Sequence, residues 1–168
     1  LYLLTALAAA LEAGREILAV YRSSDFEVEE KADKSPLTLA DRRSHSIIGS
    51  RLACFEIPVL SEEGKNIPYE ARKKWDTYWL IDPLDGTKEF IKRNGEFTVN
   101  IALIEDSEPV MGVIYAPDKN QLYFGLKGQG SFKIGSADRI EELARAWLAP
   151  YICLPVAAGK KKAGEVWD

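Results

Sequence analysis

The chain has 168 residues, of which 46% are hydrophobic and 29% charged, and it carries a formal net charge of −4 at pH 7. This composition is typical of one folded globular domain with a substantial core and excludes a disordered chain. The negative balance argues against a surface that coats nucleic acid, and no apolar run in the sequence approaches the about 20 residues of a transmembrane helix.

Cysteine and histidine are scarce, and this limits the catalytic chemistry. Cys54 and Cys153 lie too far apart in the sequence to form a metal-ligand pair, so free thiols in a reducing compartment are expected. His45 is the single histidine and lies in a polar helical segment. The sequence therefore predicts neither a zinc site nor a histidine-based triad.

The first third of the chain predicts two helices separated by a polar loop. Apolar residues at helical spacing predict an amphipathic helix over residues 2–22, and alternation over residues 26–31 predicts a short strand. Thr38 is the expected N-cap of a second helix that extends through Leu52, and Asp41 three positions later is placed for a capping box. Such a cap would explain Asp41 without any catalytic role.

Residues 58–64, with the sequence Pro-Val-Leu-Ser-Glu-Glu-Gly, are a short apolar segment that ends in two acids. Adjacent glutamates repel each other unless a cation or solvent relieves them, so one of Glu62 and Glu63 is expected to point inward as a ligand. A solvated acidic loop is the simpler explanation of this pair taken alone. Residues 66–76 predict an exposed connection or a short helix.

The stretch Trp79–Phe90 contains several candidate metal-binding residues close together in the sequence. Residues 78–81 predict a strand that carries Asp82 out of the core, and Pro83 then predicts a turn. Asp82 and Asp85 would flank this bend, with the carbonyl of Leu84 outside any regular ladder. Carboxylate and carbonyl oxygens are the ligands that Mg²⁺ or Mn²⁺ prefers.

Gly86 permits a close approach or an unusual φ at the end of this bend. Residues 87–91 then predict a short helix whose first amides would point back at the bend and favour a phosphate. An ordinary proline turn with an aspartate cap explains the same residues. Taken alone, the stretch leaves a metal site and a simple turn equally open.

The remaining sequence predicts mainly strands. Residues 97–104 and 109–116 predict two strands around the turn at residues 105–108, and residues 121–124 and 131–134 predict two more, which gives an antiparallel meander. The glycines at 125, 128 and 130 lack the spacing of a dinucleotide-binding fingerprint and are interpreted as hairpin glycines. Residues 138–148 predict a helix and residues 151–156 a strand.

Three acidic segments follow one another along the chain: Asp41, then Glu62–Glu63, then Asp-Pro-Leu-Asp-Gly-Thr at residues 82–87. This ordered set resembles the magnesium-dependent, lithium-sensitive phosphatase superfamily, which includes inositol monophosphatases, fructose bisphosphatases and bisphosphate nucleotidases. Residues 33–41, 59–63 and 85–104 most resemble the bacterial CysQ type, a 3'(2'),5'-bisphosphate nucleotidase. The resemblance extends over about residues 1–135.

The resemblance implies an α+β fold, the layered helix and antiparallel-sheet sugar-phosphatase fold. Residues 1–135 would be its metal-binding N-terminal domain and residues 136–168 a fragment of the C-terminal domain. In the family, a second domain supplies a Trp-Asp motif whose aspartate is a metal ligand. Trp167–Asp168 resembles that motif after far too few residues, so the second domain is expected to be largely missing.

The resemblance also implies a set of site residues. The implied metal ligands are Glu62, Asp82, the carbonyl of Leu84, Asp85 and Asp168, which would hold two or three Mg²⁺ ions, with Mn²⁺ as a substitute. The implied catalytic residues, which orient or deprotonate the attacking water, are Asp41, Glu62 and Thr87. The implied substrate contacts are Asp85, Gly86, Thr87 and Lys88.

The expected reaction is removal of the 3'-phosphate of adenosine 3',5'-bisphosphate by metal-activated water, with lithium as an inhibitor. Two alternatives stay open: an inositol monophosphatase or other sugar phosphatase, and a non-catalytic fragment that binds metal or phosphate. Lys88-Glu89-Phe90 after Thr87 favours the nucleotidase. The resemblance further implies a small phosphorylated substrate with no nucleic-acid partner, a homodimer, and a cytoplasmic location that extends to the periphery of the inner membrane.

Overall fold

The computed structural model describes residues 1–23, 28–30 and 36–135. Its helices are α1 (Tyr2–Arg22), α2 (Leu39–Leu52), α3 (Tyr69–Arg72) and α4 (Thr87–Ile91), with a 3₁₀ turn η1 (Ala53–Phe55) after α2. Its strands are β1 (Glu29–Glu30), β2 (Pro36–Leu37), β3 (Val59–Ser61), β4 (Thr77–Asp85), β5 (Thr98–Glu105), β6 (Glu108–Ala116), β7 (Gln121–Leu126) and β8 (Gly130–Ile134). The helix and strand predicted at 138–148 and 151–156, and Asp168, lie outside the described residues.

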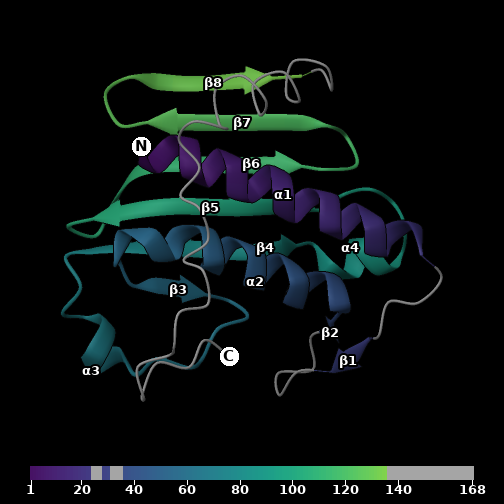
Figure 1. The fold of residues 1–168 in the computed structure, drawn as a ribbon, viewed down its shortest axis with the longest axis horizontal. Helices are drawn as coiled ribbons and strands as arrows, with labels where there is room; N and C mark the ends of the chain where they lie inside the picture. Colours follow the sequence, from purple (N-terminus) through teal and green to yellow (C-terminus); the bar gives the residue numbers. More distant parts are fainter. Residues whose placement is uncertain (24–27, 31–35, 136–168) are drawn as a thin grey trace.

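The main sheet has six strands in the order β3-β4-β5-β6-β7-β8 (Figure 1). The strands from β4 onward pair antiparallel, which confirms the predicted meander. The β3–β4 pair is parallel, with Ser61 opposite Ile81. A parallel neighbour needs a crossover connection, and residues 62–76, which include α3, supply it.

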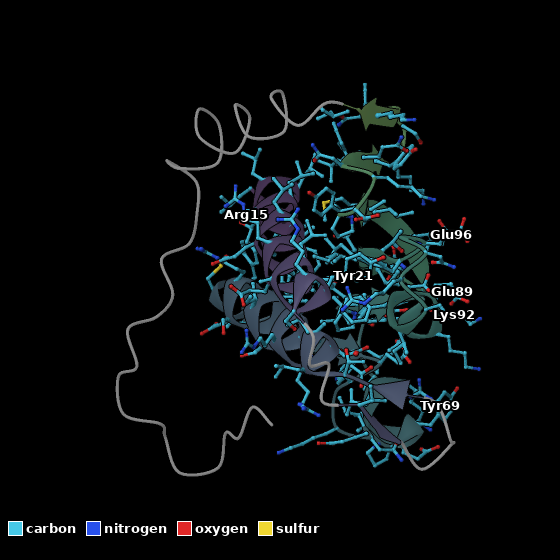
Figure 2. The ribbon with its side chains drawn as sticks, turned by 90° about the vertical axis from the view of Figure 1, so that its right-hand side faces the viewer. Arg15, Tyr21, Tyr69, Glu89, Lys92 and Glu96 are labelled. Carbon is cyan, nitrogen blue, oxygen red and sulfur yellow. The ribbon has the colours of Figure 1, made fainter. Side chains whose placement is uncertain are left out.

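Helices α1 and α2 lie together on one face of this sheet (Figures 1 and 2). Helix α1 contacts β5 and β6, and helix α2 contacts β4. The packed side of α1 is rich in alanine, since Ala6, Ala9 and Ala13 have no exposed surface, whereas the leucines Leu4 and Leu7 are only partly buried. Small side chains let the helix lie close to the sheet.

The core lies between the helices and the sheet. Ile81, Ile101 and Val113 are aligned across β4, β5 and β6 and are each at most 2% exposed. Side chains alternate between the faces of a sheet, so Leu80 and Ile114 point the other way and are 43% and 47% exposed. Within the described ranges, no helix combines the length and apolar character needed to cross a membrane.

An aromatic cluster joins the end of α1 to α4. The ring of Tyr21 lies 5.2 Å from that of Phe90 and 4.9 Å from that of Phe97, measured between centroids. Figure 2 shows Tyr21 at this junction. The cluster fixes the position of α4, which follows directly on the acidic stretch of β4.

The prediction that the chain turns at Pro83 is wrong. Strand β4 continues through Pro83 to Asp85, which pairs with Thr98, and the register shifts between Asp82 and Asp85. Proline has no amide to give to a ladder, and a bulge accommodates it without ending the strand. The strand predicted at residues 26–31 is described only as β1, which pairs with β2.

Candidate active site

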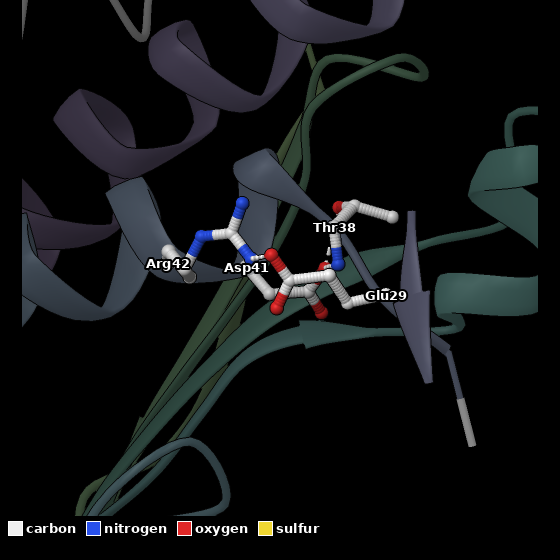
Figure 3. Close-up of polar contacts among 4 residues, drawn as sticks. All are labelled: Glu29, Thr38, Asp41 and Arg42. Atoms are coloured by element: carbon white, nitrogen blue, oxygen red, sulfur yellow. Dashed lines mark hydrogen bonds and ion pairs between the residues drawn. The ribbon is translucent and has the colours of Figure 1, made fainter. Parts of the chain in front are cut away.

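Asp41 lies at the start of α2 and uses both of its carboxylate oxygens. The backbone N–H and the hydroxyl of Thr38 donate to Oδ2 over 2.7 and 2.5 Å, which confirms the predicted capping box (Figure 3). The hydroxyl of Thr87 lies 3.1 Å from Oδ1. Asp41 therefore caps its helix and also contacts the first residue of α4.

The Asp41 carboxyl is completely buried. This burial raises its pKa, while the hydrogen bonds from Thr38 and Thr87 act in the opposite direction. The Thr87 hydroxyl lies 3.1 Å from the carbonyl oxygen of Leu84 as well. A hydroxyl carries one proton, so Thr87 bridges the acid and the carbonyl and can donate to only one of them at a time.

Close to the same helix end, Arg42 forms an ion pair with Glu29 of β1 over 3.1 Å (Figure 3). The Glu29 side chain is 65% exposed, so this pair contributes little to stability by itself. Its effect is to tie the small β1–β2 sheet to the first turn of α2, beside Thr38.

The bulge of β4 is fixed by hydrogen bonds from three directions. Ser44 of α2 donates to the carbonyl oxygen of Pro83 over 2.7 Å, and the N–H of Leu84 donates to Asp82 Oδ1 over 3.2 Å. Asn100 of β5 donates through Nδ2 to Asp85 Oδ2 over 3.1 Å. The two acids of the bulge are thus held in defined orientations.

Three of the predicted ligands interact around Asp82. Burial first, then the negative charges of Glu62 and Asp85 and a hydrogen bond with Glu62, raise the pKa of Asp82 to about 7. Glu62 reaches this point because it directly follows β3, and its N–H donates to the carbonyl oxygen of Ile81 over 3.2 Å. The parallel strand pair thus brings together acids 20 positions apart in the sequence.

This donor set fits magnesium. Mg²⁺ takes oxygen ligands, commonly one or two protein carboxylates plus waters, and its charge would relieve the repulsion that raises the pKa of Asp82. Glu62, Asp82 and Asp85 are the residues that would hold it. Among the residues described, no group of three or more His, Cys, Asp or Glu side chains lies close enough together to hold a metal ion without further ligands.

A groove of about 620 Å³ opens beside these acids. Its lining includes Glu62, Asp82 and Asn100 together with the exposed apolar side chains Leu80 and Ile114, and Ile114 is paired with Asn100 in the sheet. Arg72 of α3 also lines it and supplies a positive charge. The groove therefore combines acidic, basic and apolar side chains.

The remaining predicted site residues directly follow β4, at the N-cap and first turn of α4. Gly86 has φ +93°, and a Cβ there would lie 2.6 Å from the carbonyl oxygen of Glu96, so both reasons predicted for a glycine hold. Thr87 and Lys88 are the first residues of α4, and the side chain of Lys88 is exposed.

Three residues to which the sequence assigned no role in the site also take part. Asn100 is a polar residue within an apolar strand, and Ser44 and His45 lie three and four positions after Asp41 on the same helix. These positions in the sequence were the features from which a role in the site could have been predicted. His45, for which no partner is evident in the sequence, has Nδ1 2.8 Å from Oγ of Ser61, and burial lowers its pKa.

The arrangement of buried Asp41 with Thr87, and of Glu62 with Asp82 and Asp85, is that of an acid-rich centre suited to a phosphate and a divalent cation. The model of the inositol monophosphatase family matches residues 2–150. The chain belongs to the inositol monophosphatase family, and the predicted α+β fold with helices layered on a mainly antiparallel sheet is confirmed.

Within the family, the chain is similar to nucleotidases of the CysQ type. The 3'(2'),5'-bisphosphate nucleotidase CysQ of Shigella flexneri is 52% identical over 123 residues, which are 71% of this chain and 50% of the relative. The crystal structure of CysQ from Bacteroides thetaiotaomicron is 57% identical, with a TM-score of 0.70 over 79% of this chain and 48% of that one. The chain thus spans about half the length of the curated relatives it matches.

A third comparison concerns the fold alone. The crystal structure of an IMPase/NADP phosphatase complexed with Mg²⁺ and phosphate has a TM-score of 0.64 at 22% identity, over 74% of this chain and 47% of that chain. Its likeness extends the same sheet and helix arrangement to a distant family member.

Proposed function

We propose that this chain forms the metal-binding part of a magnesium-dependent phosphomonoesterase that removes the 3'-phosphate of adenosine 3',5'-bisphosphate. The observation that carries the proposal is the convergence of Glu62 and Asp85 on the partly buried Asp82, where burial first and then the two neighbouring negative charges raise the pKa of Asp82 to about 7. The mutual repulsion of carboxylates held together in this way is relieved either by a bound proton or by a bound divalent cation. The identity to CysQ nucleotidases supports the choice of substrate.

Magnesium, when bound, supplies positive charge to the phosphate and lowers the pKa of bound water. Glu62, Asp82, Asp85 and the carbonyl of Leu84 are its proposed ligands. Asp168 is proposed as a further ligand and lies outside the described residues. Two or three ions per site, and replacement by Mn²⁺, belong to the same proposal.

The residues of the chain act on water and phosphate. Asp41 and Thr87 orient the attacking water, whose proton passes toward Asp41 Oδ1 through the Thr87 hydroxyl, 3.1 Å away. Glu62 assists from the end of β3. Asp85, Gly86, Thr87 and Lys88 contact the substrate, with the backbone N–H groups of Gly86 and Thr87 as the proposed donors to its phosphate.

Two other functions remain as alternatives. The family includes inositol monophosphatases, so hydrolysis of inositol or sugar phosphates is the nearest one. A non-catalytic fragment that binds metal or phosphate is the second, since the chain spans about half of its relatives. Division into a metal-binding domain at 1–135 and a fragment at 136–168, a homodimer, a cytoplasmic or inner-membrane location, and lithium inhibition all remain predictions.

A phosphate-release panel tests the substrate. Protein expressed from the complete natural reading frame is assayed with Mg²⁺ on adenosine 3',5'-bisphosphate, inositol phosphates and sugar phosphates, with lithium as an added inhibitor. The nucleotide is expected to give the highest kcat/KM. Faster release from inositol phosphate would replace the nucleotidase by the first alternative.

The variant Asp85→Asn tests the metal site. Loss of one carboxylate charge is expected to weaken magnesium binding and lower turnover at least about 100-fold. Calorimetric titration with Mg²⁺ and steady-state rates measure the two effects. The matched control is Asp106→Asn in the exposed β5–β6 turn, where asparagine suits the positive φ of 50°. Near-normal rates for Asp85→Asn would rule out its role as a ligand.

A further inference from the structure

The side chain of Ser61 connects helix α2 to the turn that carries the two glutamates. His45 Nδ1 lies 2.8 Å from Ser61 Oγ, and the N–H of Glu63 donates to the same oxygen over 3.2 Å. Ser61 is the last residue of β3, so Glu62 leaves the strand directly after this junction. One hydroxyl thus joins α2, the strand end and the glutamate turn.

The chemistry of this junction is well defined. A serine hydroxyl has one proton and two acceptor positions, and the Glu63 N–H occupies one of the acceptor positions. The Ser61 proton can therefore point at His45 Nδ1. Burial of His45 favours its neutral ring, in which one nitrogen is an acceptor.

His45 belongs to a face of α2 that contacts three segments of the site. Asp41 contacts Thr87, Ser44 holds the carbonyl of Pro83, and His45 contacts Ser61. Positions i, i+3 and i+4 lie on one side of a helix, so a single rigid element contacts three separate pieces of chain. Of these contacts, the one from His45 serves the Glu62 segment.

The backbone of Glu62 is also held by β4, because its N–H donates to the carbonyl oxygen of Ile81 over 3.2 Å. We propose that His45 is a positioning residue for Glu62: through Ser61 it fixes the direction in which Glu62 leaves β3 toward Asp82. The consequence for metal affinity rests on the proposed function, whereas the consequence for the order of the turn does not.

The first measurement needs no metal. Amide hydrogen exchange of the Glu62–Gly64 turn is followed in the wild type, in His45→Leu, which fills space without a hydrogen-bonding group, and in His45→Asn. The asparagine amide reaches the position of Nδ1 and can donate or accept. Loss of one hydrogen bond is expected to speed exchange about 3- to 10-fold in His45→Leu, and His45→Asn should restore the wild-type rate.

The second measurement is metal affinity by calorimetric titration with Mg²⁺. His45→Leu and Ser61→Ala are each expected to raise Kd about 3- to 10-fold. The double variant should be no weaker than the single ones, because both remove the same link. Ser46→Leu, which places the same side chain on the exposed neighbouring position of α2, is the control and should leave Kd unchanged.

The results separate this inference from the proposed function. Unchanged exchange in His45→Leu, or failure of His45→Asn to restore it, overturns the positioning role whether or not magnesium binds. Additive effects of His45→Leu and Ser61→Ala on Kd overturn it as well. A wild type that shows the expected exchange pattern but binds no Mg²⁺ supports the positioning role and contradicts the proposed function.

Discussion

Asp41 divides its two oxygens between two segments of the chain. Oδ2 accepts both donors of Thr38, its N-cap, whereas Oδ1 faces Thr87, which lies 46 positions later. The sequence predicted a helix cap at Asp41, and the family resemblance implied that the same side chain orients or deprotonates water. The structure confirms the cap and shows that it uses one oxygen and leaves the other for a distant contact.

Asp82 gives a prediction about pH. Its pKa in the folded protein is raised to about 7 from 3.8, so the folded state holds this proton more firmly than the unfolded chain. The resulting stability is fully present below pH 3.8 and is lost as the pH rises through about 7. In metal-free solution, Asp82→Asn should therefore exceed the wild type in free energy of unfolding at pH 8 by at least about 1 kcal/mol.

Chemical denaturation in a chelator, at intervals from pH 5 to 8, measures this difference. The control is Asp76→Asn, a change of the same kind at an exposed position before β4. Addition of Mg²⁺ should favour the wild type over Asp82→Asn. Equal pH dependence for wild type and Asp82→Asn would show that the three acids do not repel one another as described.

At the scale of elements, the junction of β4 and α4 depends on one glycine. Gly86 has φ +93°, and a Cβ would lie 2.6 Å from the Glu96 carbonyl oxygen, which belongs to the backbone and cannot rotate away. Gly86→Ala is expected to lower the free energy of unfolding by about 2 kcal/mol or more. Urea denaturation measures this loss.

Gly49 in α2 provides the opposite case for comparison. A Cβ at Gly49 would meet nothing within 4 Å, and its φ lies outside the left-handed region. Gly49→Ala should raise the free energy of unfolding by about 0.5–1 kcal/mol, because alanine restricts the unfolded chain and favours helix. A loss at Gly49, or none at Gly86, would contradict the geometry described for that position.

At the scale of the whole molecule, stability depends on how closely α1 lies against the sheet. A Cβ added at Gly14 would lie 2.4 Å from Cε1 of Tyr115 in β6. Gly14→Ala is therefore expected to lower the free energy of unfolding by about 1–3 kcal/mol. Thermal and urea unfolding of the purified protein measure it.

A second substitution tests the cause of that loss. Tyr115→Ala removes both ring atoms that the new methyl group would meet and leaves only Pro117 Cγ at 3.2 Å, so Gly14→Ala in that background should lower stability by less than about 1 kcal/mol. Additive losses would place the cause in the helix itself. Comparison of Gly14→Ala in the two backgrounds thus tests whether close packing of α1 against the Tyr115 ring causes the loss of stability.

The sequence by itself determined the elements and the chemistry available to them. Periodicity located α1, α2 and the strands of the meander, Thr38 and Asp41 marked a helix start, and the ordered acidic segments indicated the family. These features are local because spacing and residue type fix them within a few positions. The sequence could not show that β4 continues past Pro83.

Only the tertiary structure decided which residues meet. The parallel placement of β3 beside β4 brings Glu62 to Asp82, the antiparallel neighbour β5 lets Asn100 donate to Asp85, and α2 contacts Thr87, Pro83 and Ser61 from one face. The physical reason is that these hydrogen bonds and charge interactions join separate elements. Their existence depends on strand order, register and helix packing, which no local pattern in the sequence encodes.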